Sequence, residues 1–360
     1  MEKEVLLSGI GEINFNIIET VNRPQSIHGI YPYRGKISSL EASGIIKQIP
    51  QKAILLDPFC GSGTIIFESI MNNIDTLGVD NNPLAYILTK GKVNCLEHNR
   101  ENFIYEVKKI ISKSKDLDKF PDMPESAKKH FHNLSSKEIM RVSYFFENMS
   151  DYLKTAFLGA IALTARGCNH YKWTSSTVGK DINPKRYINF YDKFAEKVSK
   201  HHPQISKENN SKIFLGDSRK LSKFISEKSV DFVFTSPPYF DCLDYTSYYG
   251  KIILEILGYD RLKIKKKLIQ NIKNYKEDMK KVMEEIIKIT KDNARIIFVV
   301  GDKKIGKEII KGSDLFSELI KHKPLKVIER EYTNSSSQVF DKLNKTKRKE
   351  QIIIWDKSRW

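Results

Sequence analysis

The feature that most constrains the fold is a short apolar run that ends in an acidic residue and a glycine-rich turn. It reads Ile54-Leu55-Leu56-Asp57-Pro58-Phe59-Cys60-Gly61-Ser62-Gly63-Thr64, and a helical pattern follows to about residue 72. The apolar run predicts a buried strand over 53–56, and the glycines predict a tight turn that lets the backbone approach a ligand. A strand, turn and helix in this order form a ligand-binding crevice at the carboxyl end of a strand in an α/β sheet.

The rest of the chain extends this pattern into one doubly wound α/β sheet that is interrupted once. We expect further strands over 76–79, 212–215, 230–234, 294–300, 325–332 and 351–355. We expect helices over 39–48, 82–96, 101–114, 136–148, 151–166, 185–201, 245–257, 269–290 and 315–322. Because no strand pattern occurs between about 97 and 206, this stretch is interpreted as a helical insertion between sheet segments 1–96 and 207–360.

The glycine turn restricts the ligand that the first crevice can bind. It lacks the Lys of a triphosphate-binding loop and the third Gly of a dinucleotide-binding turn, a position occupied by Ile66. Asp57 at the strand end would repel a pyrophosphate but suits a ligand that carries an ammonium group. Asp80 ends the next strand roughly 20 residues later, at the spacing where an acid binds ribose hydroxyls. S-adenosylmethionine, with its amino group, sulfonium and ribose, fits these requirements.

A second motif follows the strand over 230–234 and reads Thr235-Ser236-Pro237-Pro238-Tyr239. The two prolines stop the strand and leave backbone carbonyls available in the crevice. Ser236 Oγ and the Pro237 carbonyl are suited to accept the two N–H bonds of an aromatic amine and to aim its lone pair at a methyl donor. Tyr239 offers a flat face on which a flipped-out base can stack.

The two motifs together resemble those of the amino-group DNA methyltransferases, which modify cytosine N4 or adenine N6. Asp57 to Thr64 is similar to the cofactor motif of that family, and Thr235 to Tyr239 to its catalytic motif in the Ser-containing form that goes mostly with cytosine N4. Tyr31-Pro32-Tyr33-Arg34-Gly35-Lys36 resembles the element that helps to bind the methionine moiety. Leu215-Gly216-Asp217-Ser218 resembles the element whose acid contacts the adenine of the cofactor.

The resemblance implies a Rossmann-like, S-adenosylmethionine-dependent methyltransferase sheet, with 1–96 as the lead-in and cofactor half and 207–360 as the catalytic half. It makes the insertion over 97–206 the candidate target-recognition region. The expected catalytic residues are Ser236, Pro237, Pro238 and Tyr239. The expected cofactor-binding residues are Tyr31, Lys36, Asp57, Pro58, Phe59, Gly61, Gly63, Thr64, Asp80, Asn81, Asp217, Ser218 and Thr235. One departure is that many Ser-Pro-Pro-Tyr enzymes place the catalytic motif before the cofactor motif, whereas here the order is reversed.

Charge and composition bear on the partners. The formal net charge of +17 favours a polyanionic partner. The resemblance implies that this partner is double-stranded DNA with the target base flipped out; whether a cognate restriction endonuclease is a further partner stays open at this point. Eleven Lys or Arg residues lie between Arg261 and Lys291 and could contact phosphates, while the loop from Asn169 to Ser176 could reach base edges. The four cysteines are scattered and no metal site is expected. Without an apolar span or a leader pattern, we expect a cytoplasmic protein.

Three alternatives to cytosine N4 in DNA stay open at this point. Adenine N6 of DNA is the nearest, and an amino group of RNA such as tRNA is the second, although no RNA-binding module is recognisable. The third is a catalytically silent DNA-binding module, against which Ser236, Tyr239 and Asp57 argue. Methylation of cytosine C5 is disfavoured because the sequence contains no Pro-Cys dipeptide.

Overall fold

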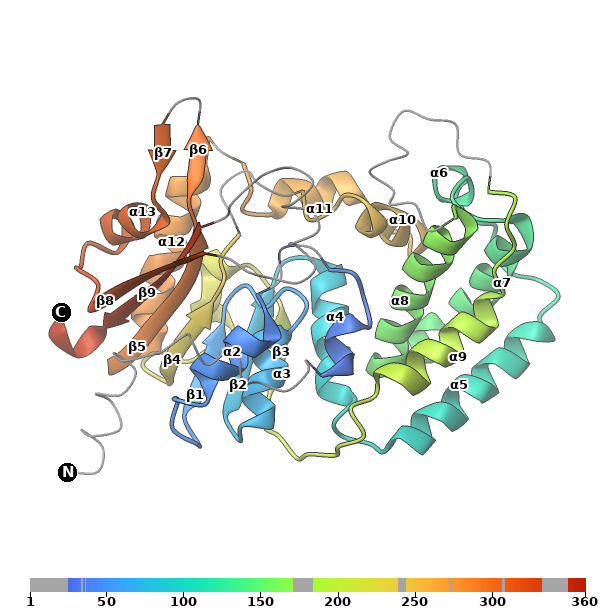
Figure 1. Cartoon of the computed structure of the whole chain (residues 1–360), viewed down its shortest axis with the longest axis horizontal. Helices are drawn as coiled ribbons and strands as arrows, with labels where there is room; N and C mark the ends of the chain where they lie inside the picture. Colours follow the sequence, from blue (N-terminus) through green and yellow to red (C-terminus); the bar gives the residue numbers. More distant parts are fainter. Residues whose placement is uncertain are drawn as a thin grey trace.

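The protein is described here by a computed structural model that covers residues 25–33, 35, 37–170, 184–238, 244–271, 273–305, 308–331 and 349–360. A sheet of seven strands occupies one half of the molecule and a group of helices the other (Figure 1). The sheet strands are β1 (Ile54–Asp57), β2 (Asp75–Asp80), β3 (Lys212–Leu215), β4 (Val230–Thr235), β5 (Thr290–Gly301), β8 (Lys326–Glu331) and β9 (Lys349–Asp356). A separate hairpin consists of β6 (Lys303–Ile305) and β7 (Glu308–Ile310).

The strand order is β3-β2-β1-β4-β5-β9-β8, and β9 is the strand that runs antiparallel to its neighbours. The chain moves outward from β1 to β3 and then returns to β4 on the other side of β1, so the order reverses between β1 and β4. In open α/β sheets, ligands bind outside the carboxyl ends of the strands at such a reversal. The expected Rossmann-like α/β sheet is therefore confirmed, and its topology predicts where the site lies.

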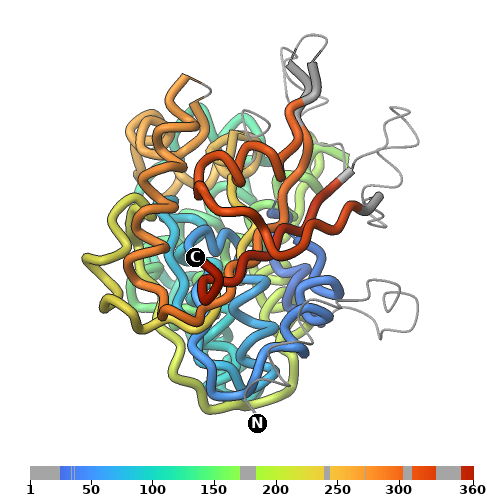
Figure 2. Tube along the Cα trace, turned by 90° about the vertical axis from the view of Figure 1, so that its left-hand side faces the viewer, coloured from blue at the N-terminus to red at the C-terminus, as the bar shows by residue number. Residues whose placement is uncertain are grey.

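The helices described are α2 (Ser39–Ile46), α3 (Thr64–Met71), α4 (Pro83–Asn94), α5 (Arg100–Lys115), α6 (Glu125–Lys128), α7 (Asn133–Ser143), α8 (Asp151–Cys168), α9 (Phe190–His201), α10 (Tyr249–Ile256), α11 (Arg261–Lys267), α12 (Tyr275–Ile289) and α13 (Gly312–Ile320). Short 3-10 turns are η3 (Ser26–Gly29), η4 (Phe146–Asn148), η6 (Ser218–Lys223) and η7 (Lys357–Arg359). Seen from the β8 edge, α12 and α13 lie on one side of the sheet and α2 on the other (Figure 2).

The two faces of the sheet are set by alternation along each strand, because successive side chains of a strand point to opposite faces. In β5, Ile297 and Val299 join the apolar cluster of α2 and α3. The alternate residues Ile296 and Phe298 join the cluster of α12 and α13 on the other face. The central strands are thus buried on both sides, which explains why they read as continuous apolar runs.

Helices α5 to α9 fall within the expected insertion and pack beyond α4 (Figure 1). Helix α8 lies against both α4 and α9. The α4–α8 approach is close because Gly91 faces Thr155, where any β-carbon would overlap the threonine side chain. Thr155 also donates a hydrogen bond of 2.9 Å to the carbonyl of Ile87. The division of the chain into 1–96, 97–206 and 207–360 stays a prediction.

Several predicted helix boundaries were wrong, and polar side chains explain most of the differences. The helix expected from 245 begins only at Tyr249, because the Asp244 carboxylate accepts hydrogen bonds from the backbone and hydroxyl of Thr246 and forms a turn instead. The helix expected over 269–290 is preceded by a separate one, α11, and begins at Tyr275 after a turn made by Asn271. Helix α9 begins at Phe190, capped by Asn189, rather than at 185.

The hairpin of β6 and β7 and helix α6 were not expected from the sequence. No helix in the described part of the chain has both the length and the apolar character that a membrane span needs.

Candidate functional site

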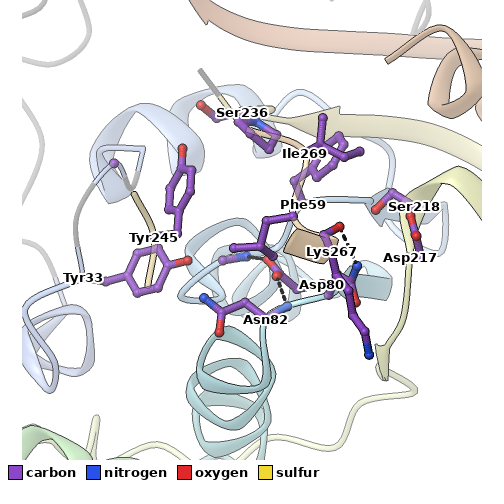
Figure 3. Close-up of a pocket in the computed structure, with 15 residues that line it drawn as sticks. Tyr33, Phe59, Asp80, Asn82, Asp217, Ser218, Ser236, Tyr245, Lys267 and Ile269 are labelled. Atoms are coloured by element: carbon purple, nitrogen blue, oxygen red, sulfur yellow. Dashed lines mark hydrogen bonds between the residues drawn. The ribbon is translucent and has the colours of Figure 1, made fainter. Parts of the chain in front are cut away.

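A cavity of about 620 Å³, open to solvent, lies at the carboxyl ends of β1, β2, β3 and β4 (Figure 3). Each of these strands is followed directly by residues that line the cavity. The lining residues are Tyr33, Gly35, Phe59, Gly61, Asp80, Asn81, Asn82, Asp217, Ser218, Ser236, Pro238, Tyr245, Lys267, Leu268 and Ile269.

The turn after β1 takes its shape from two glycines with left-handed backbone. Gly61 has φ +52° and Gly63 has φ +72°, a region that residues with a β-carbon rarely adopt. A β-carbon at Gly63 would also come within 2.9 Å of the Thr89 backbone in α4. Thr89 in turn donates a hydrogen bond of 3.1 Å to the carbonyl of Gly61. The turn is therefore packed closely against α4, and its own backbone faces the cavity.

Asp80, at the end of β2, binds the same turn through its carboxylate. One carboxylate oxygen accepts the N–H of Gly61 at 2.9 Å, and the other accepts the N–H of Asn82 at 2.9 Å. Burial raises the pKa of Asp80 to about 6, although these backbone hydrogen bonds act to lower it. A carboxylate has about four acceptor positions, so Asp80 can still accept a hydroxyl hydrogen from a ligand in the cavity.

Asp57 lies deeper, behind the cavity rather than on its wall. Its side chain is buried, and its Oδ1 accepts hydrogen bonds from the Thr235 hydroxyl at 2.7 Å and the Phe59 backbone at 3.1 Å. These bonds tie the carboxyl end of β1 to that of β4. Burial raises the pKa of Asp57 to about 7, more strongly than its hydrogen bonds lower it. The residue holds the turn in place and adds negative charge beneath it.

Asp217, which follows β3, is held by a charged network. Arg219 binds both carboxylate oxygens, with Nε–Oδ1 and Nη2–Oδ2 distances of 2.9 and 2.7 Å, and also bonds Asp278 of α12 at 2.9 Å. Burial acts to raise the pKa of Asp217, but the hydrogen bonds from Arg219 outweigh it and keep that pKa below its ordinary value. The neighbouring Ser218 hydroxyl donates to the carbonyl of Pro58, which links this element to the first turn.

The Ser-Pro-Pro motif follows β4 directly, so Ser236 lies on the cavity wall. Tyr275 of α12 donates a hydrogen bond of 2.7 Å to the carbonyl of Pro238 and fixes the end of the motif. Within the described part of the chain, no hydrogen bond involves Ser236 Oγ or the Pro237 carbonyl. Of these two acceptors, Ser236 belongs to the cavity wall, and Pro237 lies beside it.

The structure brings most of the predicted site residues to one place. Those on the cavity wall are Phe59, Gly61, Asp80, Asn81, Asp217, Ser218, Ser236 and Pro238. Those that support the wall from behind or beside it are Tyr31, Asp57, Pro58, Gly63, Thr64, Thr235 and Pro237. Lys36 and Tyr239 lie outside the described residues. Of the loop from Asn169 to Ser176, only Asn169 and His170 are described.

Several residues of the cavity wall were not predicted. They are Tyr33, Gly35, Asn82, Tyr245, Lys267, Leu268 and Ile269. Tyr33 and Gly35 lie within the element from Tyr31 to Lys36, so the sequence identified the correct segment but selected Tyr31 and Lys36 in place of Tyr33 and Gly35. Lys267 to Ile269 join α11 to α12, a junction hidden within an expected helix. Figure 3 shows Lys267 beside Asp80 and Tyr245 beside Tyr33, and the Lys267 carbonyl accepts a hydrogen bond of 3.2 Å from Asn81.

Comparison with known families matches residues 39–299 to the family model described as D12 class N6 adenine-specific DNA methyltransferase. The chain belongs to this family. The resemblance to amino-group DNA methyltransferases drawn from the sequence is thereby confirmed, and the cofactor is S-adenosylmethionine.

Three curated relatives carry the name Type II methyltransferase. M.MjaII of Methanocaldococcus jannaschii is 23% identical, over 84% of this chain and 77% of the relative. M.BsoBI of Geobacillus stearothermophilus is 25% identical, over 68% and 55% respectively. M.MvaI of Kocuria varians is 25% identical, over 64% and 56%. The match thus spans only somewhat more than half the length of the last two.

Among solved structures, the rRNA methyltransferase aviRa from Streptomyces viridochromogenes aligns over 94% of this chain and 95% of its own. The identity is 10% and the TM-score 0.38. Because this similarity is low, the fold is assigned from the strand order of the sheet and not from the alignment.

Proposed function

We propose that this chain is a site-specific DNA methyltransferase that moves the methyl group of S-adenosylmethionine to N4 of cytosine. The observation that carries the proposal is the place of Ser236, which directly follows β4 on the wall of the cavity. It stands across the cavity from Asp80, so one open space is bordered by a candidate cofactor-binding acid and a candidate amine acceptor (Figure 3).

The chemistry of the wall fits S-adenosylmethionine. In this proposal Asp80 accepts the ribose hydroxyls, while Phe59 and Ile269 provide apolar contact for the adenine beside Asp217 and Ser218. Asp57 acts from beneath the glycine turn and favours the positive charges of the amino group and sulfonium. The remaining predicted residues, Tyr31, Lys36, Pro58, Gly63, Thr64, Asn81 and Thr235, shape or complete the same site.

The methyl group that S-adenosylmethionine supplies is electrophilic because it is attached to a positively charged sulfur. The chain then has to orient an amine whose lone pair is delocalised into the base. Ser236 Oγ and the Pro237 carbonyl accept its two N–H bonds, and the nitrogen gains the methyl group and releases one proton. Tyr239 stacks the flipped-out base. No covalent bond to the enzyme forms.

Adenine N6 is the one specific alternative to cytosine N4 as the methyl acceptor. The Ser-containing catalytic motif favours cytosine N4, whereas the description of the matching family names adenine N6. Both bases present an exocyclic amino group that Ser236 and Pro237 can bind. The relatives' names support a Type II, site-specific enzyme, and a cognate restriction endonuclease belongs to the same proposal. The helices α5 to α9 are proposed as the target-recognition region.

The test is methyl transfer from labelled S-adenosylmethionine to genomic DNA and, separately, to total tRNA. We expect label in DNA, and at least about a hundredfold loss of turnover in Ser236→Ala with little change in cofactor affinity. Asp80→Ala is the matched variant on the opposite wall and should instead weaken cofactor binding. Label in tRNA alone, or full turnover in Ser236→Ala, would contradict the proposal.

A further inference from the structure

The segment from Ser26 to Tyr33, called the strap below, connects the helical insertion with the cavity. It consists of η3 and the turn that follows, in which Tyr33 N–H donates to the Tyr31 carbonyl at 2.9 Å, and its last residue, Tyr33, lines the cavity. A β-carbon on Gly61 would lie 3.4 Å from Tyr33 Cε1, so the ring rests directly on the glycine turn. Burial, and then the charge of nearby Asp80, raise the pKa of the Tyr33 hydroxyl. The position of this ring therefore shapes the cavity.

The inner side of the strap is anchored to the helices that follow β1 and β2. His28 Nε2 lies 2.7 Å from Glu68 Oε1 in α3, and Lys92 Nζ in α4 lies 3.2 Å from His28 Nδ1. All three side chains are buried. Burial raises the pKa of Glu68 to about 7. Polar groups buried in this way are bound in one arrangement, which fixes this side of η3.

The outer side of the strap is held by the insertion. Lys197 Nζ in α9 donates to the carbonyl of Gly29 at 3.2 Å, and His201 Nδ1 donates to the carbonyl of Ser26 at 2.6 Å. Because His201 donates through Nδ1, its Nε2 accepts from Lys197 at 3.3 Å, which requires a neutral ring. Burial, followed by the charge of Lys197, lowers the pKa of His201 to about 4, in agreement with that assignment.

The packing leaves the strap little room to move away from these partners. In α8, Gly159 contacts the Ile30 carbonyl so closely that any β-carbon there would overlap the oxygen. Lys197 is nine-tenths buried, and burial lowers its pKa to about 8, so keeping an ammonium in this place is costly. The hydrogen bond from Lys197 Nζ to the Gly29 carbonyl offsets part of that cost.

We propose that Lys197 of the insertion is a positioning residue for the cofactor cavity, holding the strap through the Gly29 carbonyl so that Tyr33 closes against Gly61. The inference extends the proposed function, since it requires that this cavity holds S-adenosylmethionine, but it does not depend on which base is methylated. It makes cofactor affinity depend on a residue of the helical half of the molecule.

The experiment measures the dissociation constant of S-adenosylmethionine by calorimetry on the full chain. Lys197→Met removes the donor but keeps the apolar stem, and we expect a rise of about tenfold, the worth of one hydrogen bond. Lys197→Arg keeps a donor and should restore affinity. Turnover at saturating cofactor and DNA should stay within about twofold. Lys193→Met is the control, because Lys193 lies one turn earlier in α9 and pairs with Glu196 of the same helix.

A double-mutant cycle separates positioning from a general loss of structure. If Lys197 acts through the ring, adding Lys197→Met to Tyr33→Ala should cost little beyond Tyr33→Ala alone. Additive effects, an unchanged dissociation constant in Lys197→Met, or equal losses in Lys197→Arg and Lys197→Met would overturn the inference. Asp80→Ala reports on the cavity itself: if it leaves affinity unchanged, the proposed cofactor site fails, which is distinct from failure of the strap.

Discussion

Replacing Asp57 by Asn should stabilise the protein without its cofactor. Asp57 is 2% exposed, and both hydrogen bonds it accepts end on a single oxygen, Oδ1. An Asn side chain can keep both bonds with its own Oδ1 while removing a buried negative charge. The same substitution takes that charge from beneath the turn, so it should weaken the binding of S-adenosylmethionine.

The magnitude follows from the pKa of Asp57. A carboxyl whose pKa is higher in the folded protein than in the unfolded chain favours folding while it is protonated, and this contribution is lost as the pH rises. For Asp57 the window runs from the ordinary value of 3.8 to the folded value of about 7. Across it, the cost of ionising Asp57 grows to at most about 4 kcal/mol. The Asp57→Asn variant has no such cost, because an amide does not ionise in this range.

The assay is urea unfolding of wild type and Asp57→Asn at pH 5 and pH 8, without and with S-adenosylmethionine. Without cofactor, the stability of the variant relative to wild type should increase by about 2 kcal/mol or more between the two pH values. With cofactor, wild type should recover more than the variant, because it binds the ligand more tightly. If the difference in stability between the two proteins stays the same from pH 5 to pH 8, the pKa of Asp57 is not raised by folding.

Three further predictions concern the turn, the cavity acid and the basic helix. Gly63→Ala should lower the free energy of unfolding by well over about 1 kcal/mol, because backbone strain adds to the contact with Thr89. The control Gly258→Ala, at φ +73° in open space, should lower it by only about 1 kcal/mol. Equal urea midpoints in the two variants would argue against the contact. The affinity for S-adenosylmethionine should fall as the pH drops from 8 to 5, since both Asp57 and Asp80 become protonated in that range. Asp80→Asn should show a smaller fall over the same range, because Asp57 still titrates in it. Lys266 is exposed on α11, and Lys266→Gln should lower the slope of log affinity for DNA against log salt by about 1. The control is Lys228→Gln, which should leave the slope unchanged, because Lys228 lies beside the start of β4 and pairs with Asp292 at 2.9 Å. A loss of slope in both variants would argue against α11 as the DNA contact.

The sequence was sufficient for the sheet and for those site residues that directly follow a strand. Asp57, Asp80, Asp217 and Ser236 each come at or just after the end of an apolar run, and the order of a doubly wound sheet brings such ends together. Local chemistry thus fixed both the element and its place in the site. The charged span from Arg261 to Lys291 was recognised, but its division into two helices was not.

The residues that were missed reach the cavity through tertiary packing. Leu268 and Ile269 lie in a junction that exists because Asn271 forms a turn, and nothing in the spacing of the apolar residues marks it. Tyr33 reaches the glycine turn because α9 and α4 hold the preceding strap from two sides, through partners 64 and 168 residues away in sequence. No periodicity in a single sequence reports contacts of that range.

The role proposed for Ser236 is to present the exocyclic amino group of cytosine in DNA to the methyl donor. The most direct measurement is mass spectrometry of nucleosides from DNA incubated with the protein and isotopically labelled S-adenosylmethionine. We expect labelled N4-methylcytosine with the wild-type protein and none with Ser236→Ala. Labelled N6-methyladenine in its place would contradict the cytosine assignment while keeping the transfer chemistry, and DNA without label would contradict the claim as a whole.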